Sequence, residues 1–296
     1  MVNKMSEILL TGHSGCKIYL VTKENGDKYI KKISSNINYN KRLFHQCEKQ
    51  INFQSDTIKT PKVFSYDINE DGLFQFHMEY INGITLAEYM NNISVNRIKD
   101  IVKLIIGNYE NENIGQITES QIKEKFLHKL NSLANSIDLT DKIIKESFEV
   151  LKKYNYKNFI LSNCHGDLTL ENIIISNNNI YYIDFLDSFH DSWLIDIGKL
   201  LQDIQIFWSY RNKENLNENL LIRLMIFRDI LIQELVDKNP KYFIDVYIAL
   251  LINLLRIVPY TRDVNTANFI HNKIELVLKI VEGALKSENL NYTMHG

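Results

Sequence analysis

Two short polar stretches flank an apolar hairpin near the middle of the chain, and they constrain what the chain can fold into. The first reads HGDLTLEN at 165–172, and the second is the IDF that ends at Phe185. Between them, the runs NIIIS and IYYIDF are joined by asparagines, which predicts two paired strands. Carboxylates beside a buried hairpin must be hydrogen-bonded, paired or metal-bound, because burying a bare carboxylate is costly. Asp167 and Asp184 are therefore candidate site residues.

The chain before this hairpin predicts a small β-sheet with one helix. The clearest hairpin is KIYLVTKENGDKYIKKIS at 17–34, where ENGD predicts the turn. Residues 40–54, NKRLFHQCEKQINFQ, have helical periodicity. The runs KVFSYDI and FQFHMEYI, up to residue 81, predict two further strands.

The rest of the chain has helical periodicity from about residue 85 to 160 and again from 195 to the end. VNRIKDIVKLIIGNY and DKIIKESFEVLKKY are the clearest helices. Only three prolines and no low-complexity linker interrupt the 296 residues. The predicted class is therefore α+β, with a small sheet region followed by a larger, mainly helical region that carries the central hairpin.

Composition excludes several classes of protein. A net charge of −2 gives no electrostatic footprint for nucleic acid. Cys16, Cys47 and Cys164 are scattered without a CxxC pair, which argues against disulfides or a zinc site and favours a reducing compartment. The N-terminus lacks the apolar region of a signal peptide, and YIALLINLLRIV is broken by Asn253 and Arg256, so we read it as a buried helix. We expect a cytoplasmic protein without a membrane or nucleic-acid partner; the sequence does not indicate its oligomeric state.

The polar residues around the hairpin suit one kind of chemistry. Asp167, Asn172 and Asp184 offer only oxygen ligands, which suit magnesium bound with substrate phosphates. The alternative is that Asp167 caps a turn and Asp184 a strand end, because short motifs often occur by chance.

The full set of motifs is more specific. HGDLTLEN followed by IDF resembles the H-x-D-x-x-x-x-N and D-F pattern of phosphoryl-transfer enzymes. In the same order, GHSGCKIYLV resembles a nucleotide-covering loop, YIKKI the lysine strand, MEYINGITL the hinge and LIDIGKLLQD the helix that anchors the catalytic loop. On these segments the chain resembles the aminoglycoside phosphotransferase and choline kinase superfamily. IDFLDSFHDSWLIDIGKL is also similar to members linked to carbohydrate and capsule metabolism.

The resemblance implies a bilobal, protein-kinase-like fold. Residues 1–80 would form a nucleotide-binding lobe, and residues 81–296 a catalytic and substrate-binding lobe. The implied activity moves the γ-phosphoryl of ATP, with Mg²⁺, to a hydroxyl of a small molecule such as a sugar, an aminoglycoside or a choline-like aminoalcohol. Whether ATP or GTP is preferred stays open.

The resemblance also implies residue roles. Asp167 would be the catalytic base, and His165 would orient its loop. Asn172 and Asp184 would hold magnesium. Asp196 resembles the buried aspartate that accepts hydrogen bonds from the catalytic-loop backbone.

Two adjacent lysines compete for the phosphates. Side chains alternate along a strand, so Lys32 shares a face with Ile30, and Lys31 shares one with Tyr29. The residue two before the phosphate-binding lysine would lie beside the adenine, where isoleucine fits better. We therefore predict Lys32, with Lys31 as the alternative. Glu48, the acidic residue of the 40–54 helix, is the predicted partner of Lys32, or else a surface glutamate.

The nucleotide loop TGHSGCK departs from the G-x-G-x-x-G pattern. It has only Gly12 and Gly15, and backbone N–H groups near Ser14 would meet phosphate. An ordinary β-turn is the alternative.

The resemblance places the adenine against the hinge. Backbone groups of Glu79 and Ile81 would face the adenine edge, and Met78 would lie at the back of the pocket. Asp187 could be a substrate ligand, a residue behind the metal ligands or a solvated turn residue.

The acceptor itself is not specified by the sequence. Acidic and aromatic residues follow the catalytic segment: Asp191, Trp193, Asp203, Trp208 and Tyr210. The acids would favour a cationic acceptor and the aromatics a sugar face or an amine, while core packing explains the tryptophans equally well.

Three other functions compete with a small-molecule kinase. A kinase-fold binding module without turnover is disfavoured because the required Lys, Asp and Asn residues are present. A metal-dependent phosphohydrolase would leave the lysine strand and hinge unused. A compact protein kinase is disfavoured because only eleven residues, FLDSFHDSWLI, separate Asp184 from Asp196, and no A-P-E follows.

Overall fold

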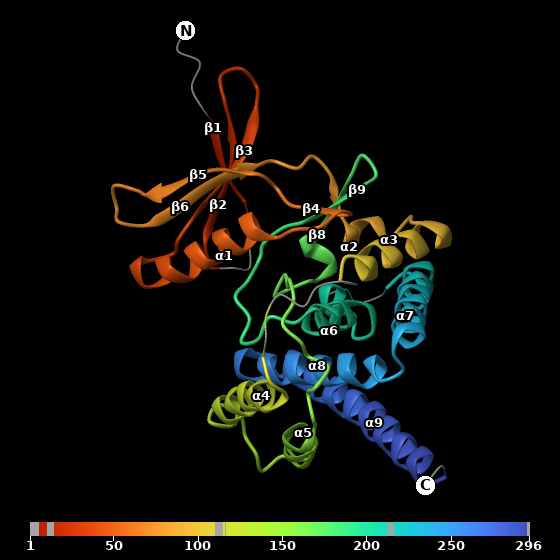
Figure 1. Ribbon diagram of the computed structural model, residues 1–296. Coiled ribbons are helices and arrows are strands. Elements are labelled where there is room, and N and C mark those ends of the chain that lie inside the picture. The colour runs from red at the N-terminus through yellow and green to blue at the C-terminus, as the bar shows by residue number, and fades with distance from the viewer. Residues whose placement is uncertain are drawn as a thin grey trace. The chain divides into compact units, whose positions relative to one another are not determined.

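The computed structural model describes residues 6–294 apart from 11–14, 110–114, 116, 212 and 214–215. The chain forms two compact units. The first combines Met1–Tyr89 with Glu171–Asp187, and the second combines Met90–Leu170 with Ser188–Gly296 (Figure 1). The two predicted lobes divide the chain at one point, between residues 80 and 81, and their functional roles remain a prediction. The packing units differ in that the central hairpin belongs to the first.

The first unit contains the predicted antiparallel sheet, with strand order β1-β2-β3-β6-β5. The strands are β1 Ser6–Leu10, β2 Lys17–Thr22, β3 Lys28–Ile33, β5 Val63–Ile68 and β6 Phe74–Glu79. The predicted 17–34 hairpin is confirmed as β2 and β3. Its turn uses Gly26 at φ 87°, a left-handed conformation that glycine adopts without a steric penalty.

Helix α1, Asn40–Asn52, packs on this sheet where the sequence predicts a helix. Leu43 and Cys47 of α1 join an apolar cluster with side chains of β3 and β6. The Asn40 amide donates to the Gly72 carbonyl at 2.8 Å and accepts from the Phe74 N–H at 2.9 Å, which fixes the start of α1 to the β5–β6 hairpin.

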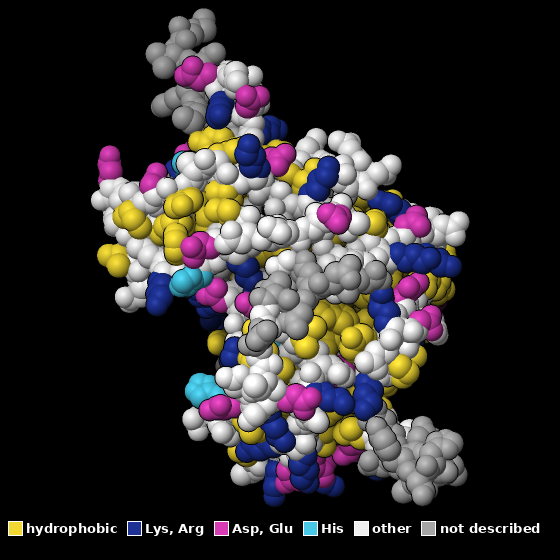
Figure 2. Space-filling model, in the orientation of Figure 1, with side chains coloured by type: hydrophobic (Ala, Val, Ile, Leu, Met, Phe, Trp, Pro, Cys, Tyr) yellow, Lys and Arg dark blue, Asp and Glu magenta, His cyan; other side chains and the backbone are white. Residues whose placement is uncertain are grey.

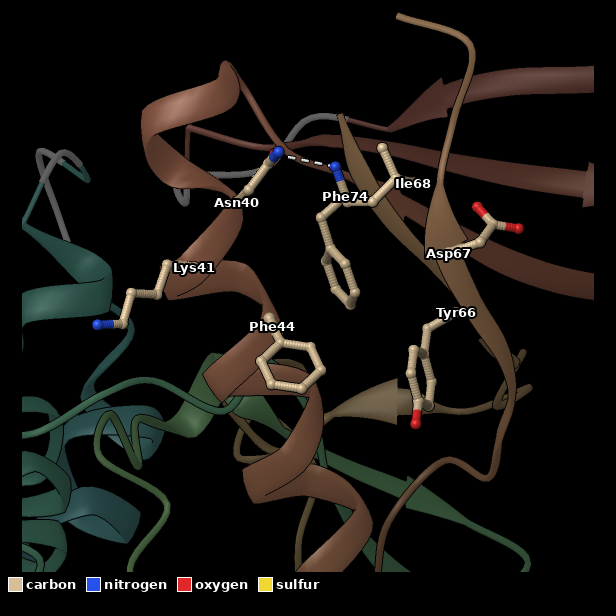
Figure 3. Close-up of a pocket in the computed structure, with 7 residues that line it drawn as sticks. All are labelled: Asn40, Lys41, Phe44, Tyr66, Asp67, Ile68 and Phe74. Carbon is tan, nitrogen blue, oxygen red and sulfur yellow. Dashed lines mark hydrogen bonds between the residues drawn. The ribbon is translucent and has the colours of Figure 1, made fainter. Parts of the chain in front are cut away.

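A groove of about 440 Å³ opens between α1 and the β5–β6 hairpin (Figure 3). Its lining residues are Asn40, Lys41, Phe44, Tyr66, Asp67, Ile68 and Phe74. None of the described residues predicted for the nucleotide or the metal lines it, so this groove is separate from the candidate site.

The central hairpin forms a second sheet within the first unit, in the order β4-β9-β8-β7. The strands are β4 Ile58–Lys59, β7 Ile84–Thr85, β8 Ile173–Ser176 and β9 Asn179–Tyr182, and the short helix α2 spans Leu86–Tyr89. Asn177 and Asn178 both have positive φ, at 47° and 65°, as the tight turn between β8 and β9 requires. The predicted strands and their asparagine turn are confirmed.

The second unit is helical, as predicted. Its long helices are α3 Val95–Gly107, α4 Glu119–Ala134, α5 Lys142–Lys153, α6 Trp193–Ile204, α7 Glu218–Lys238, α8 Tyr242–Ile257 and α9 Val264–Met294. Side chains of Ser94, Thr118 and Asp141 cap the first three by accepting backbone N–H groups that lack partners within the helix. α8 packs against α6, α7 and α9.

Helix α8 is the apolar segment that the sequence analysis reads as a buried helix. Tyr242–Tyr260 is long and apolar enough to cross a membrane, with a mean hydropathy of 1.7, but 67% of the apolar window is buried inside the protein. Asn253 is among its buried residues. Within the described residues α8 therefore has the environment of a core helix.

Gly198 allows α6 to approach α8 closely. A Cβ added at Gly198 would lie 2.6 Å from the Cβ of Ala249 and 3.0 Å from the Leu250 nitrogen. Such distances require the two helices to move apart.

We predict that Gly198→Ala lowers the free energy of unfolding by about 1–3 kcal/mol through overpacking. Gly283→Ala is the matched control, because a Cβ at Gly283 in α9 meets no atom within 4 Å. That change should be neutral or stabilise by about 0.5–1 kcal/mol, as alanine favours a helix over glycine. Urea unfolding measures both, and equal stability of Gly198→Ala and wild type would contradict the close approach.

Candidate active site

Lys32 on β3 is buried and ion-paired. Its side chain is 3% exposed, and its ammonium group contacts the Asp184 carboxylate. Lys31 points to the other face of the strand, where its Nζ lies 3.0 Å from the Glu7 carboxylate. The strand alternation that favours Lys32 over Lys31 therefore has a structural counterpart, because the buried ammonium is the one beside the predicted metal ligand. Phosphate binding by Lys32 remains a prediction.

The predicted pair of Lys32 with Glu48 is wrong for this structure. Glu48 is exposed, and its carboxylate lies 3.3 Å from Nδ1 of His45 on the same helix. The buried face of α1 carries Leu43, Gln46, Cys47 and Gln50 instead. A buried ammonium needs a carboxylate at hydrogen-bonding distance, and Asp184 supplies it.

Asp184 follows β9 in a left-handed backbone conformation, with φ at 61°. This conformation costs free energy for a residue other than glycine, and such residues cluster at functional sites. The Ile183 N–H donates to the Asn172 carbonyl at 3.0 Å, so the backbone joins the two predicted metal-ligand segments.

The donor set of this region fits magnesium. Asp184 and Asn172 provide carboxylate and amide oxygens, the ligands that Mg²⁺ takes while retaining waters and substrate phosphates. No group of three or more His, Cys, Asp or Glu side chains in the described part of the chain could hold a metal ion. A transition-metal site of that kind is therefore not formed by these residues.

In the second unit, Asp196 anchors the predicted catalytic loop. Its side chain is fully buried and accepts the backbone N–H groups of His165 at 2.6 Å and Gly166 at 2.8 Å. The Tyr109 hydroxyl at 3.1 Å and the Cys164 thiol at 3.3 Å also donate to it. The predicted bonding of Asp196 to this loop is confirmed.

Asp167 lies on the anchored loop beside a cation. Its Oδ1 is 3.0 Å from the Lys199 ammonium of α6, and its N–H donates to Nδ1 of His165 at 3.2 Å. Burial raises the pKa of the Asp167 carboxyl, but the charges of Lys199, His165 and Arg256 outweigh burial and hold that pKa below its ordinary value. Asp167 is therefore a carboxylate at neutral pH, as a general base must be.

Sequence reasoning missed Lys199, although a signal exists. Asp196, Lys199 and Asp203 are spaced three and four residues apart, which places them on one face of a helix. A charged stripe on an otherwise apolar helix indicates buried partners.

Asp203 anchors the other end of the loop. Its carboxylate is fully buried and accepts the Leu170 N–H at 2.7 Å, together with the Ser209 N–H and hydroxyl at 3.0 and 2.8 Å. The idea that Asp203 attracts a cationic acceptor is therefore wrong, because its charge is already satisfied inside the protein.

Core packing accounts for two of the aromatic residues named for the acceptor. Trp193 stacks on Tyr109 with ring centroids 5.8 Å apart, and Trp193 and Tyr210 are both buried. Trp208 is partly exposed and packs under the Arg211 guanidinium at 4.1 Å. Asp191 accepts from the Ser188 hydroxyl.

The predicted nucleotide loop is only partly described. Gly12 and Ser14 lie outside the described residues, while Gly15 has a left-handed φ of 67°. Asp187, at the end of the first unit, is exposed, and its role stays open.

The predicted hinge follows β6. Met78 is buried, and its sulfur lies 3.4 Å from the Gln50 amide nitrogen. The Glu79 N–H donates to the Lys62 carbonyl at 2.9 Å, so any adenine contact by the Glu79 backbone falls to its carbonyl oxygen. Ile81 is buried as well.

Known proteins share this fold at low sequence identity. No protein-family model matches the chain, and comparison with curated proteins finds no relative. A thermostable mutant of the aminoglycoside phosphotransferase APH(4)-Ia, in a complex with AMP-PNP and hygromycin B, is 12% identical with a TM-score of 0.62, covering 94% of this chain and 95% of that one. An ethanolamine kinase from Plasmodium vivax is 18% identical with a TM-score of 0.55, covering 96% and 85%. The amicoumacin kinase hAmiN, bound to AMP-PNP and Ca²⁺, is 15% identical with a TM-score of 0.57, covering 91% and 87%. These likenesses show the kinase-like α+β fold predicted from the sequence.

We predict that Lys199→Met raises the pKa of Asp167, because the Lys199 charge no longer offsets the rise that burial causes. A carboxyl group whose pKa is lower in the folded than in the unfolded protein stabilises the folded state at pH values above its unfolded-state pKa. This contribution is lost as the pH falls through the folded-state pKa. The loss of unfolding free energy in Lys199→Met should therefore be largest near neutral pH and shrink below about pH 4.

Urea unfolding across this pH range measures the effect. The control is Lys279→Met, which removes an exposed ion pair with Glu275 and should cost little at any pH. A deficit in Lys199→Met that does not change with pH would contradict the assigned role of the ammonium charge.

Proposed function

We propose that this protein is a cytoplasmic, ATP- and Mg²⁺-dependent phosphotransferase of the aminoglycoside phosphotransferase and choline kinase superfamily. It moves the γ-phosphoryl of ATP to a hydroxyl of a small molecule. The observation that carries the proposal is the pairing of buried Lys32 with Asp184, which stands on a strained backbone directly after β9. A lysine and a metal-binding aspartate held together in this way suit the triphosphate of a nucleotide.

Each residue has one task in this mechanism. Asp167, ionised beside Lys199, accepts the proton of the acceptor hydroxyl as the phosphoryl group is transferred. Asn172 and Asp184 would hold Mg²⁺, which neutralises charge on the phosphates when bound. Lys32 binds phosphate oxygens when they arrive beside Asp184. His165 and Asp196 orient the loop that carries the base.

The nucleotide base would lie against the hinge. The Glu79 carbonyl and the Ile81 backbone would meet the adenine edge, and buried Met78 would close the back of the pocket. Gly12, Ser14 and Gly15 would cover the phosphates. Glu48 is exposed in this structure, so a role near the nucleotide would require it to exchange His45 for a new partner.

Solved structures with this fold support a small acceptor. They include an aminoglycoside phosphotransferase in a complex with AMP-PNP and hygromycin B, an ethanolamine kinase and an amicoumacin kinase. The eleven residues between Asp184 and Asp196 give little room for a peptide platform, which disfavours a compact protein kinase. A binding module without turnover is disfavoured because the lysine, the two aspartates and the asparagine that phosphoryl transfer requires are all present in the sequence.

Asp167→Asn should remove most of the phosphoryl-transfer activity while leaving ATP affinity nearly unchanged. The base acts on the acceptor and not on the nucleotide, so kcat should fall by roughly 10²–10⁴-fold. Turnover with a panel of hydroxyl compounds and calorimetric ATP titration in Mg²⁺ measure the two properties separately. Comparable turnover in the variant would refute the assignment of Asp167 as the base.

Lys32→Met should reduce turnover by on the order of 10²-fold, since an electrostatic contact to the phosphates is lost. Lys31→Met is the matched control, because Lys31 is its neighbour on the strand and pairs with Glu7 on the other face. The control should keep nearly full activity. The reverse order would move the phosphate-binding lysine by one residue.

A further inference from the structure

Strand β5 forms one edge of the five-stranded sheet in the first unit. It stands last in the order β1-β2-β3-β6-β5, and no strand within the described residues pairs with its outer side. Phe64, Tyr66 and Ile68 of β5 are large apolar residues, each more than half exposed. Figure 2 shows hydrophobic side chains gathered over the β5–β6 hairpin. An exposed apolar edge of this kind is a template for a further strand.

The backbone of this edge has hydrogen-bonding groups that point away from β6. Ile68 stands opposite Phe74 in the ladder, but the Phe74 carbonyl accepts from the Ser34 N–H and the Phe74 N–H donates to a side chain of α1, both at 2.9 Å. Ile68 and Phe74 are therefore a pair without mutual hydrogen bonds, and the backbone groups of Ile68 point outward. The ladder is regular from Ser65 to Ile68, and bonded and non-bonded pairs alternate along it. The backbone groups of Tyr66 therefore point outward as well.

Two copies of β5 can pair with each other in an antiparallel register. Only every second residue has outward groups, so few registers join two such edges. A two-fold axis at Asp67 would place two like charges directly opposite each other, which is destabilising. An axis at Tyr66 instead places Phe64 of each copy opposite Ile68 of the other, so that exposed apolar residues cover one another.

Charged residues at the two ends of the strand favour the same register. Lys62 and Glu70 are exposed, lie four residues before and four residues after Tyr66, and form no ion pair with any residue that the structure describes. The axis at Tyr66 places Lys62 of each copy opposite Glu70 of the other, and the two-fold symmetry makes this pair twice. An axis at Ser65 would place Lys62 opposite the apolar Ile68 instead.

The groove beside α1 extends this surface (Figure 3). Tyr66 and Ile68 line the groove and stand opposite Phe76 and Phe74, which belong to the apolar cluster under α1. Opposite residues of an antiparallel pair point to the same face of a sheet. The grooves of two copies would therefore adjoin at the axis, where the two Tyr66 side chains become covered.

We propose that β5 is the interface of a homodimer, in which the β5 strands of two copies pair antiparallel around Tyr66 and continue the sheet from one copy into the other. The same residues serve on both sides, as a two-fold symmetric interface requires. Because the paired segment is short, the dimer is weak and reversible. This inference is independent of the proposed catalytic activity.

Analytical ultracentrifugation of the full chain, from micromolar to near-millimolar protein, tests the proposal. The wild type should show a reversible monomer–dimer equilibrium. Tyr66→Pro should abolish it, because proline removes the N–H that donates to the second copy and is tolerated on the outer side of an edge strand. Ile68→Lys should weaken the dimer at least about tenfold, since a buried apolar contact is lost in both copies. Ile8→Lys on β1, the opposite edge, is the matched control, because Ile8 and Ile68 are both 57% exposed.

A charge exchange tests the register. Lys62→Glu and Glu70→Lys should each weaken the dimer by about threefold or more, because like charges then face each other across the two copies. The double variant restores opposite charges and should recover the affinity of the wild type. A thermal melt of each variant verifies folding, and if Tyr66→Pro unfolds, Ile68→Lys and the charge exchange decide the matter.

Three outcomes would overturn the proposal. The first is a wild type that stays monomeric at every concentration. The second is a dimer that Ile8→Lys weakens while Ile68→Lys leaves it intact, which would move the interface to β1. The third is a double charge variant that dimerises no better than either single variant, which would exclude the pairing around Tyr66. Loss of the dimer in Ile68→Lys, its persistence in Ile8→Lys and its recovery in the double variant would together support the proposal.

Discussion

The hydrogen bonds of the buried Asp196 carboxylate are the interaction on which the predicted catalytic loop depends. A fully buried charge is costly unless donors surround it, and Asp196 takes donors from His165, Gly166, Tyr109 and Cys164. Two of these are backbone N–H groups, so the charge of one helix residue determines the path of a loop distant in sequence. Gly166 adopts φ 89° there, a conformation that suits glycine. The position of Asp167 follows from this loop path.

A lysine–aspartate pair stands among the predicted site residues of each unit. In the first unit Lys32 accompanies Asp184, and in the second Lys199 accompanies Asp167. In each pair the ammonium lies beside the carboxylate and compensates its negative charge. The partners differ in one respect, since Asp184 stands on a left-handed backbone and Asp167 on a loop held from behind by a second aspartate. These settings agree with the proposed roles of Asp184 in metal binding and of Asp167 in proton transfer.

Most of the architecture could be predicted from periodicity and turn residues. The strands on both sides of Gly26 and the helix at 40–54 follow from local patterns that tertiary packing reinforces. The choice of Lys32 over its neighbour also follows from a local rule, the alternation along a strand. The partner of Glu48 could not be predicted in this way, because the rotation of a helix about its own axis is determined by the sheet that it covers.

The contacts of Lys199 could not be predicted from the sequence either. Helical spacing places Lys199 on one face with Asp196, but only tertiary folding determines that Asp167, the proposed base, stands opposite it. The acidic residues near the acceptor were misread for the same reason. The sequence analysis treats Asp203 as a charge available to a ligand. The structure buries its carboxylate, which accepts backbone N–H groups. Burial, which a single sequence does not reveal, decides whether a carboxylate attracts a ligand.

The second sheet has a consequence for the order of events during synthesis. β4 pairs in parallel with β9, joining Ile58 to Ile180, and β7 pairs with β8, joining Ile84 to Ile175. The first unit therefore cannot be completed while the ribosome has translated only its N-terminal portion. Residues 90–170, which belong to the helical unit, must be synthesised before β8 and β9, the strands that pair with β7 and β4. Such distant pairings slow folding. A gene fragment that ends at Tyr89 would leave β4 and β7 with unsatisfied backbone groups, so the two units are separate in packing but not separable by cutting the gene once.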